Sequence, residues 1–589
     1  MPNPYDPADL ARLRRAMENS RFQLEPFRRR HKEAMEQYVG VYYSDNGAER
    51  PVHVNLMEIA VNIYERQLIA RPPRVNILTR MGKLKPTAAK LESVMNALLE
   101  NTSIHREMAR AVKSALFSIG IVKIGRKYVG SFEVDGVEID KTVPFAKQIL
   151  LDDWVHDMSA LSMEECSFMG HRYRMSLSEA RENPDFDKKE RERLQKMDAS
   201  LFNPGGDESI SSISAQSNYH EDEYDPKVEL WEMWLPKSRL LVTLGPNEDA
   251  KPLRVVEWDG PEQGPFHLLF FNEVDGNSMP LAPAMLWQGL HRIVNSMYRK
   301  LERQASRQKT VGLARGVDTE DAERLRMASD GEVVPINGGL PIEEVAMGGI
   351  DQNTFAFMLQ SKEMFSWLSG NLDALGGLGP QSETVGQDRL MFASANQRIS
   401  GMQDAVSLFV SRVLTDWGFY LWQEPLESYP ASIQPPGMEA IQSELTAEER
   451  NNAAYYDMML NIEPYSMQFK SPGERLQTLN GIVNGVLMPS LPLLQQQGMG
   501  LDLGALMSLY SEYADLPELA DIITYVNRPE SIGAPPSEGP GKPSVTHRTN
   551  ERVSRPGATR QGAEQVLVNQ MLGGNSQQSE KEGAARQMS

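Results

Sequence analysis

The chain has 589 residues, enough for several domains, and a formal net charge of −19 at pH 7. Non-specific DNA binding needs clustered Lys and Arg, so we expect any contact with nucleic acid to be local or weak. The single cysteine, Cys166, excludes an intrachain disulfide and a CxxC metal site, which fits a reducing compartment. We see neither a secretory signal nor an apolar run of the roughly 20 residues that span a bilayer, and expect a soluble protein.

The N-terminal part alternates between helical and strand patterns. Apolar spacing predicts helices over residues 6–37, 51–70 and 91–120, the last ended by Gly120 in a left-handed conformation. The first helix is rich in arginine, which is typical of a solvated arm; the alternative is a face that meets an acidic neighbouring subunit. Alternation predicts strands over residues 75–78, 121–128, 131–139 and 143–151, the last three antiparallel.

An acidic turn follows these strands. Asp152, Asp153, His156 and Asp157 are close enough in sequence to ligate Mg²⁺ or Mn²⁺. No second carboxylate–histidine cluster is apparent for a two-metal site, so a structural loop is favoured. A metal-dependent nuclease that uses these four residues remains the enzymatic alternative.

A second set of strands is expected next. Residues 167–173 predict a strand, with His171 as a sheet residue, and Ser176 with Glu179 has the pattern of a capping box that starts a helix. Residues 205–225 are rich in Ser and acids and indicate a linker or mobile loop. A further antiparallel sheet is predicted from strands over residues 228–235, 240–244, 253–258 and 266–271.

The central stretch has the order helix, small β element, helix, glycine-rich loop, long helix. The helices are predicted over residues 283–309, 351–369 and 382–422, and the β element near residues 311–313 and 331–336. Gly376, Gly377, Gly379 and Pro380 indicate the loop. Beyond it, helices are predicted over residues 448–460, 473–486 and 503–513, with a capping box from Thr446 to Glu449. The composition from about residue 527 is typical of disorder.

Motifs for catalysis are missing from the sequence. There is no G-x-x-x-x-G-K-[ST], HExxH or GxSxG pattern, and no two histidines are spaced i, i+4. We therefore expect no enzymatic activity, no catalytic residues, no cofactor and no bound metal.

The central order resembles the portal (head-to-tail connector) proteins of tailed bacteriophages, particularly the podovirus-like ones. The resemblance rests on the order of elements from about residue 20 to 520 and on Ser382-Glu-Thr-Val after the loop. It implies an α+β fold, mainly α, with long helices and small antiparallel sheets in a wing, stem, clip and crown. The implied domains are wing 1–282, stem helix 283–309, clip 310–350, stem helix 351–369, tunnel loop 370–381, long wing helix 382–423, helical crown 424–526 and a mostly disordered tail 527–589.

The resemblance also implies a function and partners. Such proteins form a ring, typically of twelve copies, at one capsid vertex of the virion, and the host cytoplasm is where they assemble. The ring is a channel for DNA packaging and genome ejection. Expected partners are other copies of the chain, the major capsid protein, the terminase large subunit, the tail adaptor, scaffold and non-specifically bound double-stranded DNA, with no membrane. Another virion structural protein, such as an adaptor or scaffold, is the non-enzymatic alternative.

Two groups of residues are the candidate site. A basic set on the first stem helix either pairs with acids of the neighbouring stem or forms a band that faces DNA or capsid: Arg292, Arg299, Lys300, Arg303 and Arg307. The tunnel loop is expected to follow a moving duplex, since it is short of large side chains; its residues are Asn371, Leu372, Asp373, Leu375, Gly376, Gly377, Leu378, Gly379 and Gln381. Its leucines are loop anchors or, alternatively, bumps that face DNA.

Overall fold

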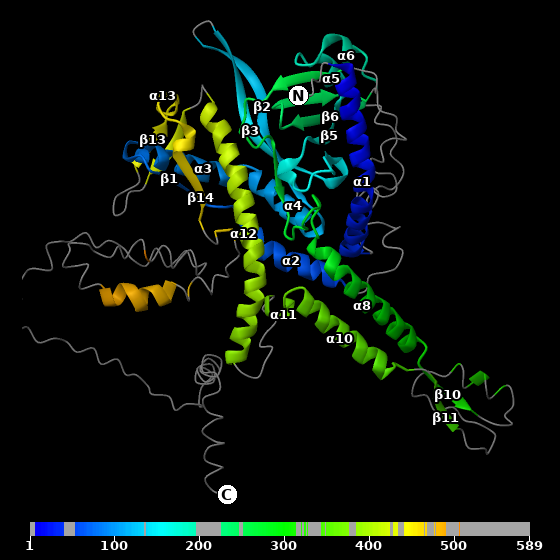
Figure 1. Ribbon diagram of the computed structural model, residues 1–589. Coiled ribbons are helices and arrows are strands. Elements are labelled where there is room, and N and C mark those ends of the chain that lie inside the picture. Colours follow the sequence, from blue (N-terminus) through cyan, green and yellow to red (C-terminus); the bar gives the residue numbers. More distant parts are fainter. Residues whose placement is uncertain are drawn as a thin grey trace, which may run out of the picture. The chain divides into compact units, whose positions relative to one another are not determined.

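The computed structural model confirms a mixed α+β fold, mainly helical, with small antiparallel sheets (Figure 1). It describes residues 6–40, 54–134, 137–195, 225–246, 251–313, 320, 323–324, 327, 343–347, 349–375, 385–424, 428–433, 441–463, 466–467, 476, 479–490 and 506. The chain divides into two compact units, Met1–Ser471 and Pro472–Ser589. The predicted loop 205–225, except Asp225, the helix 503–513, except Leu506, and the tail from 527 lie outside the described residues.

The N-terminal helix α1 (Pro7–Val39) is packed along one side, so its interpretation as a solvated arm is wrong. One of its buried residues is Arg28, whose guanidinium donates hydrogen bonds to the carbonyl oxygens of Leu151 (3.3 Å) and Trp154 (3.0 Å). Because an arginine carries several N–H groups, this one side chain can bond both carbonyls. The arginine-rich pattern therefore includes a structural arginine that fixes α1 to residues 151–154.

His31 of α1 gives this helix a pH-dependent contribution to stability. Its ring is buried against Phe117, and burial lowers the pKa of His31 to about 4. The unfolded chain has a histidine pKa near 6.5, so its His31 binds a proton that the folded chain excludes as the pH falls from about 6.5 towards 4. Stability from this residue is present above pH 6.5 and is lost across that window.

We expect His31→Leu to weaken the acid sensitivity of folding. Between pH 7 and pH 5 the wild-type chain should lose about 2 kcal/mol more unfolding free energy than the variant. Urea unfolding at the two pH values measures the difference, and the carboxylates titrate equally in both proteins. Equal losses in wild type and variant would contradict the buried, neutral state of this ring.

Three further helices complete the N-terminal part: α2 (Leu56–Ile69), α3 (Lys85–Asn101) and α4 (Ile104–Phe117). The single helix predicted over residues 91–120 is wrong, because Thr102 adopts an extended conformation and ends α3. Gly120 is also not a left-handed stop: it is the first residue of strand β2. A side chain there would collide with the carbonyl of Ala111 on α4, so glycine allows the close approach of strand and helix.

The region predicted as the wing has two antiparallel sheets. The first has the strand order β3-β2-β9, from β2 (Gly120–Val134), β3 (Val137–Ile149) and β9 (Phe266–Leu269). The strand predicted over 121–128 continues to Val134 in β2, with an irregularity between Tyr128 and Gly130, whereas the strand predicted over 131–139 is divided: its last three residues belong to β3. Residues 266–271 were predicted to extend the other sheet, but β9 pairs with β2.

The second sheet has the order β4-β5-β6-β7-β8. Its strands are β4 (Trp154–His156), β5 (Met169–Ser176), β6 (Lys227–Leu235), β7 (Leu240–Leu244) and β8 (Arg254–Glu257), flanked by the 3₁₀ turns η3 (Leu151–Asp153) and η4 (Met163–Glu165). Helices α5 (Leu177–Glu182) and α6 (Lys188–Glu192) follow β5. The capping box at Ser176 is wrong, since its hydroxyl bonds that of Ser178.

The central elements match their predicted order. They are α8 (Pro283–Ser306), β10 (Lys309–Leu313), β11 (Glu343–Met347), α10 (Gln352–Leu368), α11 (Leu372–Leu375) and α12 (Val385–Gln423). Strand β11 was not predicted, and residues 331–336 lie outside the described residues. α12 passes through the largest hydrophobic core, where Val406, Val413 and Trp417 are buried.

The region predicted as the start of a helical crown is largely β structure. It holds β12 (Tyr429–Ile433), β13 (Ile441–Leu445), the short helix α13 (Ala447–Asn451), η7 (Tyr455–Asp457) and β14 (Met458–Ile462). β14 pairs with β1 (Val75–Thr79), so the helix predicted over 448–460 is wrong beyond Asn451. A 3₁₀ turn, η2 (Gly82–Leu84), follows β1. The capping box from Thr446 to Glu449 is confirmed. The π-helical turn η8 (Val483–Leu487) lies in the second compact unit.

Candidate functional site

Helices α8 and α10 pack antiparallel and, with β10 and β11, form what we call the stem hairpin (Figure 1). At one end, the Lys300 ammonium bonds the hydroxyl of Thr354 at 3.2 Å, and Gln304 accepts the backbone N–H of Asp351 at 3.2 Å. Asp351 itself caps α10 by accepting the N–H of Thr354 at 3.1 Å. Beyond these residues β10 and β11 pair antiparallel, so the hairpin ends in a two-stranded β element.

The root of the stem hairpin is fixed to α2 and to the segment before it. The Asn295 amide makes two hydrogen bonds of 3.0 Å with the backbone of Val54, one as donor and one as acceptor. The Tyr64 ring stacks on Trp287 at a centroid distance of 5.2 Å, and its hydroxyl donates to the carbonyl of Ser369 at 2.7 Å. One α2 side chain thus holds both stem helices, which gives the hairpin a rigid base.

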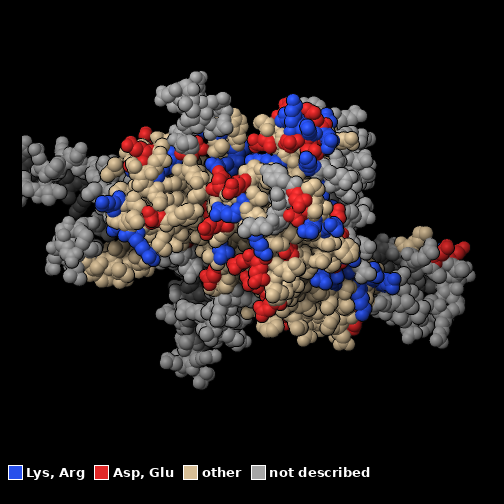
Figure 2. All heavy atoms as spheres, turned by 45° about the horizontal axis from the view of Figure 1, so that its top comes forward, with Lys and Arg blue, Asp and Glu red and all other residues tan. Residues whose placement is uncertain are grey.

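The basic set occupies one side of α8. At about 100° per residue its five members fall within an arc of roughly 100°, away from the buried side at Trp287 and His291. Arg292 pairs with Glu33 of α1 at 2.9 Å, an acid of the same chain, and Arg303 and Arg307 are exposed. Arg299 also has an interaction partner. Figure 2 shows one face of the molecule, on which acidic and basic side chains are interspersed.

Helix α10 is apolar on nearly every side, although in one chain three of its buried residues, Thr354, Ser361 and Phe365, lie on the α8-facing side and the fourth, Ser366, bonds Asp373 of α11. Only Lys362 and Glu363 are charged among its 17 residues. Five large apolar side chains are 41–67% exposed: Phe355, Phe357, Leu359, Met364 and Trp367. By helical geometry, Phe355 and Leu359 lie on one flank of the α8-facing side, Phe357 and Met364 on the other, and Trp367 roughly opposite α8. A helix apolar all round is normally buried all round.

The tunnel-loop residues divide into a fixed part and a part outside the described residues. Gly370 and Asn371 both have positive φ, 90° and 56°, so the chain reverses directly after α10 into α11. Leu372 and Leu375 are 5% and 7% exposed in the largest core, which agrees with their interpretation as anchors. Asp373 accepts a hydrogen bond from Ser366 at 2.9 Å. Gly376, Gly377, Leu378, Gly379 and Gln381 lie outside the described residues.

The acidic turn does not bring its four residues together. Asp153 pairs with Arg172 at 2.6 Å, and Asp157 accepts hydrogen bonds from Ser159 and Ser167. His156 accepts the Trp154 indole N–H at Nδ1 (3.1 Å), which leaves Nε2 to donate to Ser278 (2.9 Å). Both ring nitrogens are thus engaged. Over the described part of the chain, no group of three or more His, Cys, Asp or Glu side chains is placed to hold a metal ion.

Comparison with known proteins adds no assignment: no protein-family model and no curated protein matches the chain. Within the described ranges, no helix is long and apolar enough to cross a membrane. The sequence interpretation missed the outward apolar side chains Phe357, Met364 and Trp367. The signal that could have revealed them is the low charge of α10, with apolar residues too numerous for one face.

Proposed function

We propose that this chain is a phage portal protein, a subunit of a ring at one capsid vertex that forms the channel for DNA packaging and ejection. The observation that carries the proposal is α10, a stem helix with apolar side chains exposed on both flanks. The order stem helix, β element, stem helix, loop and long helix adds support, because this order is what the resemblance to portal proteins rests on.

The positions of the exposed apolar residues favour a ring over a two-fold dimer. A dimer covers one self-complementary patch, whereas a subunit in a ring meets a different neighbour on each side. The flank with Phe355 and Leu359 and the flank with Phe357 and Met364 provide two such surfaces. Their burial would contribute about 25 cal/mol for each Å² of apolar surface removed from water. The stem helices of adjacent copies would then form a continuous wall.

The proposed mechanism is passive. Terminase, docked on the ring, hydrolyses ATP and moves the DNA; the tail adaptor later takes its place. Twelve copies of a chain with net charge −19 repel phosphate except where basic residues gather, so the duplex slides without being held. The loop after α11 contacts the duplex, and the buried Leu372 and Leu375 fix its starting point to the wing. No step in this mechanism needs a catalytic residue of the chain.

Native mass spectrometry with negative-stain imaging of the purified protein tests the proposal. We expect closed rings of about twelve copies with a central hole. Some ring proteins wait for scaffold, so a monomeric preparation is mixed with scaffold protein and imaged again. A chain that forms no ring in either condition would overturn the portal assignment.

A further inference from the structure

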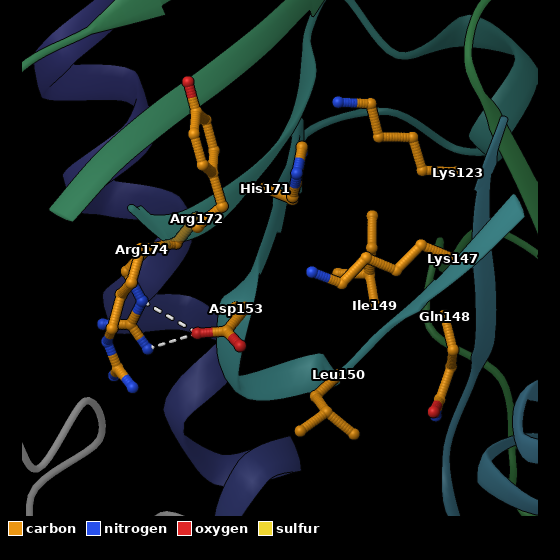
Figure 3. A pocket seen from close by; sticks show the side chains of 10 residues that line it. Lys123, Lys147, Gln148, Ile149, Leu150, Asp153, His171, Arg172 and Arg174 are labelled. Carbon is orange, nitrogen blue, oxygen red and sulfur yellow. Dashed lines mark hydrogen bonds and ion pairs between the residues drawn. The ribbon is translucent and has the colours of Figure 1, made fainter. Parts of the chain in front are cut away.

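A pocket of about 300 Å³ lies in the wing between the β2–β3 pair and β5, away from the stem hairpin (Figure 3). Its lining is rich in cations: Lys123 from β2, Lys147 from β3, and Arg172 and Arg174 from β5, against one carboxylate, Asp153. In a chain with net charge −19, such a local excess of positive charge is unexpected. The pocket volume is at the lower end of the range for small-molecule sites.

Two lysines in this pocket face each other. Lys123 and Lys147 are directly opposite in the β2–β3 register, and like charges in that position destabilise a sheet. Lys123 is compensated by an ion pair with Glu232, and Arg172 by Asp153 and Glu229. Lys147 is exposed and forms no ion pair with a described residue. The fold thus keeps two ammonium groups opposite each other, and only that of Lys123 has a carboxylate partner among the described residues.

His171 also lines the pocket and lies beside the two lysines. Figure 3 shows Lys123 and Lys147 extending towards it from the neighbouring sheet, whereas Gln148 points away and bonds Ser114. The imidazole is 7% exposed, and its Nδ1 has no hydrogen-bond partner in the described structure. Burial and the two ammonium groups hold the pKa of His171 well below its usual range, so the ring is neutral in a positive field.

We propose that this pocket binds the phosphate group of a small phosphate monoester, held between the ammonium groups of Lys123 and Lys147 beside the His171 ring. A phosphate monoester is largely dianionic at pH 7, which matches two converging lysines. The pocket offers more space than one phosphate group fills, and Ile149, Leu150 and the Tyr173 ring line the remainder. None of the residues that line this site belongs to the stem hairpin.

Isothermal titration calorimetry of the full chain tests the site with inorganic phosphate, adenosine 5′-monophosphate and adenosine, at constant ionic strength. The test variant is Lys147→Gln. The matched control is Lys127→Gln, which removes an equal charge from an exposed position on β2 outside the pocket lining. We expect both phosphate ligands to bind the wild type, adenosine not to bind, and Lys147→Gln to weaken binding about tenfold or more. Lys127→Gln should change the affinity less than about twofold.

The two phosphate ligands distinguish the source of the anion. Equal affinities would support a site for free phosphate, and tighter binding of the nucleotide a site for the ester; both support phosphate recognition. No binding of either ligand at about 10 mM would overturn the proposal. Equal weakening by both lysine variants would also overturn the proposal, because it would reveal a general charge effect. Adenosine binding as tightly as its monophosphate would overturn it too, because the phosphate group would then contribute nothing to binding.

Discussion

The double substitution Phe357→Glu and Met364→Glu on α10 is expected to abolish ring assembly and leave a folded monomer. The two side chains are 50% and 49% exposed in a single chain, so the charges remain solvated there. In a ring each carboxylate would be buried against a neighbouring stem without a partner, at a cost of several kcal/mol. We expect the dissociation constant between subunits to rise at least about a hundredfold, which native mass spectrometry measures.

A matched control separates this interface from a general effect of added charge. Phe22→Glu and Leu161→Glu change residues that are 82% and 65% exposed on α1 and in a wing loop, and add the same charge away from the stem. Rings should persist in this control. If the α10 variant assembled as well as wild type, the exposed apolar side chains would not lie between copies, and the main support for a ring would be lost.

The stem hairpin could be predicted from the sequence because its determinants are local. The helix predicted over 283–309 is α8, Pro283–Ser306, since Pro283 suits a first helical turn and apolar residues recur at three and four positions. The same reasoning failed at residues 448–460. Met458, Leu460 and Ile462 alternate at the strand period of two, and the strand that they form pairs with β1, almost 400 residues earlier in the chain.

Partners distant in sequence account for two further differences from the sequence interpretation. Nothing in residues 266–271 indicates that β9 pairs with β2 instead of β8. Nothing in the sequence distinguishes Arg28 from the other arginines of α1; its role depends on the carbonyls of Leu151 and Trp154, more than 120 residues away. At the site, the interpretation of the loop leucines as anchors agrees with the burial of Leu372 and Leu375. The outward face of α10 was missed because apolar periodicity was assumed to mark only the core of the chain.

Deletion of the glycine-rich residues Gly376–Gln381 is expected to leave rings intact and to prevent stable retention of packaged DNA. The deletion starts after Leu375 because Leu372 and Leu375 are buried in the wing core and support the fold. The removed residues are the part of the loop with little side-chain bulk, which we propose contacts the duplex. DNase-protected DNA after packaging into capsids with variant portals measures the loss, and negative-stain imaging counts the rings.

A core substitution distinguishes loss of the loop from loss of the wing. Leu372→Ala with Leu375→Ala keeps the glycines but creates cavities, at a cost of about 2–5 kcal/mol for each leucine. It should lower the thermal stability of the chain, which the deletion should not do. A deletion variant that retained DNA normally would remove the loop from the mechanism. A deletion variant that yielded only folded monomers would instead make the loop an assembly element. The stem interface on α10 is unchanged in this variant and would by itself be expected to hold adjacent copies together.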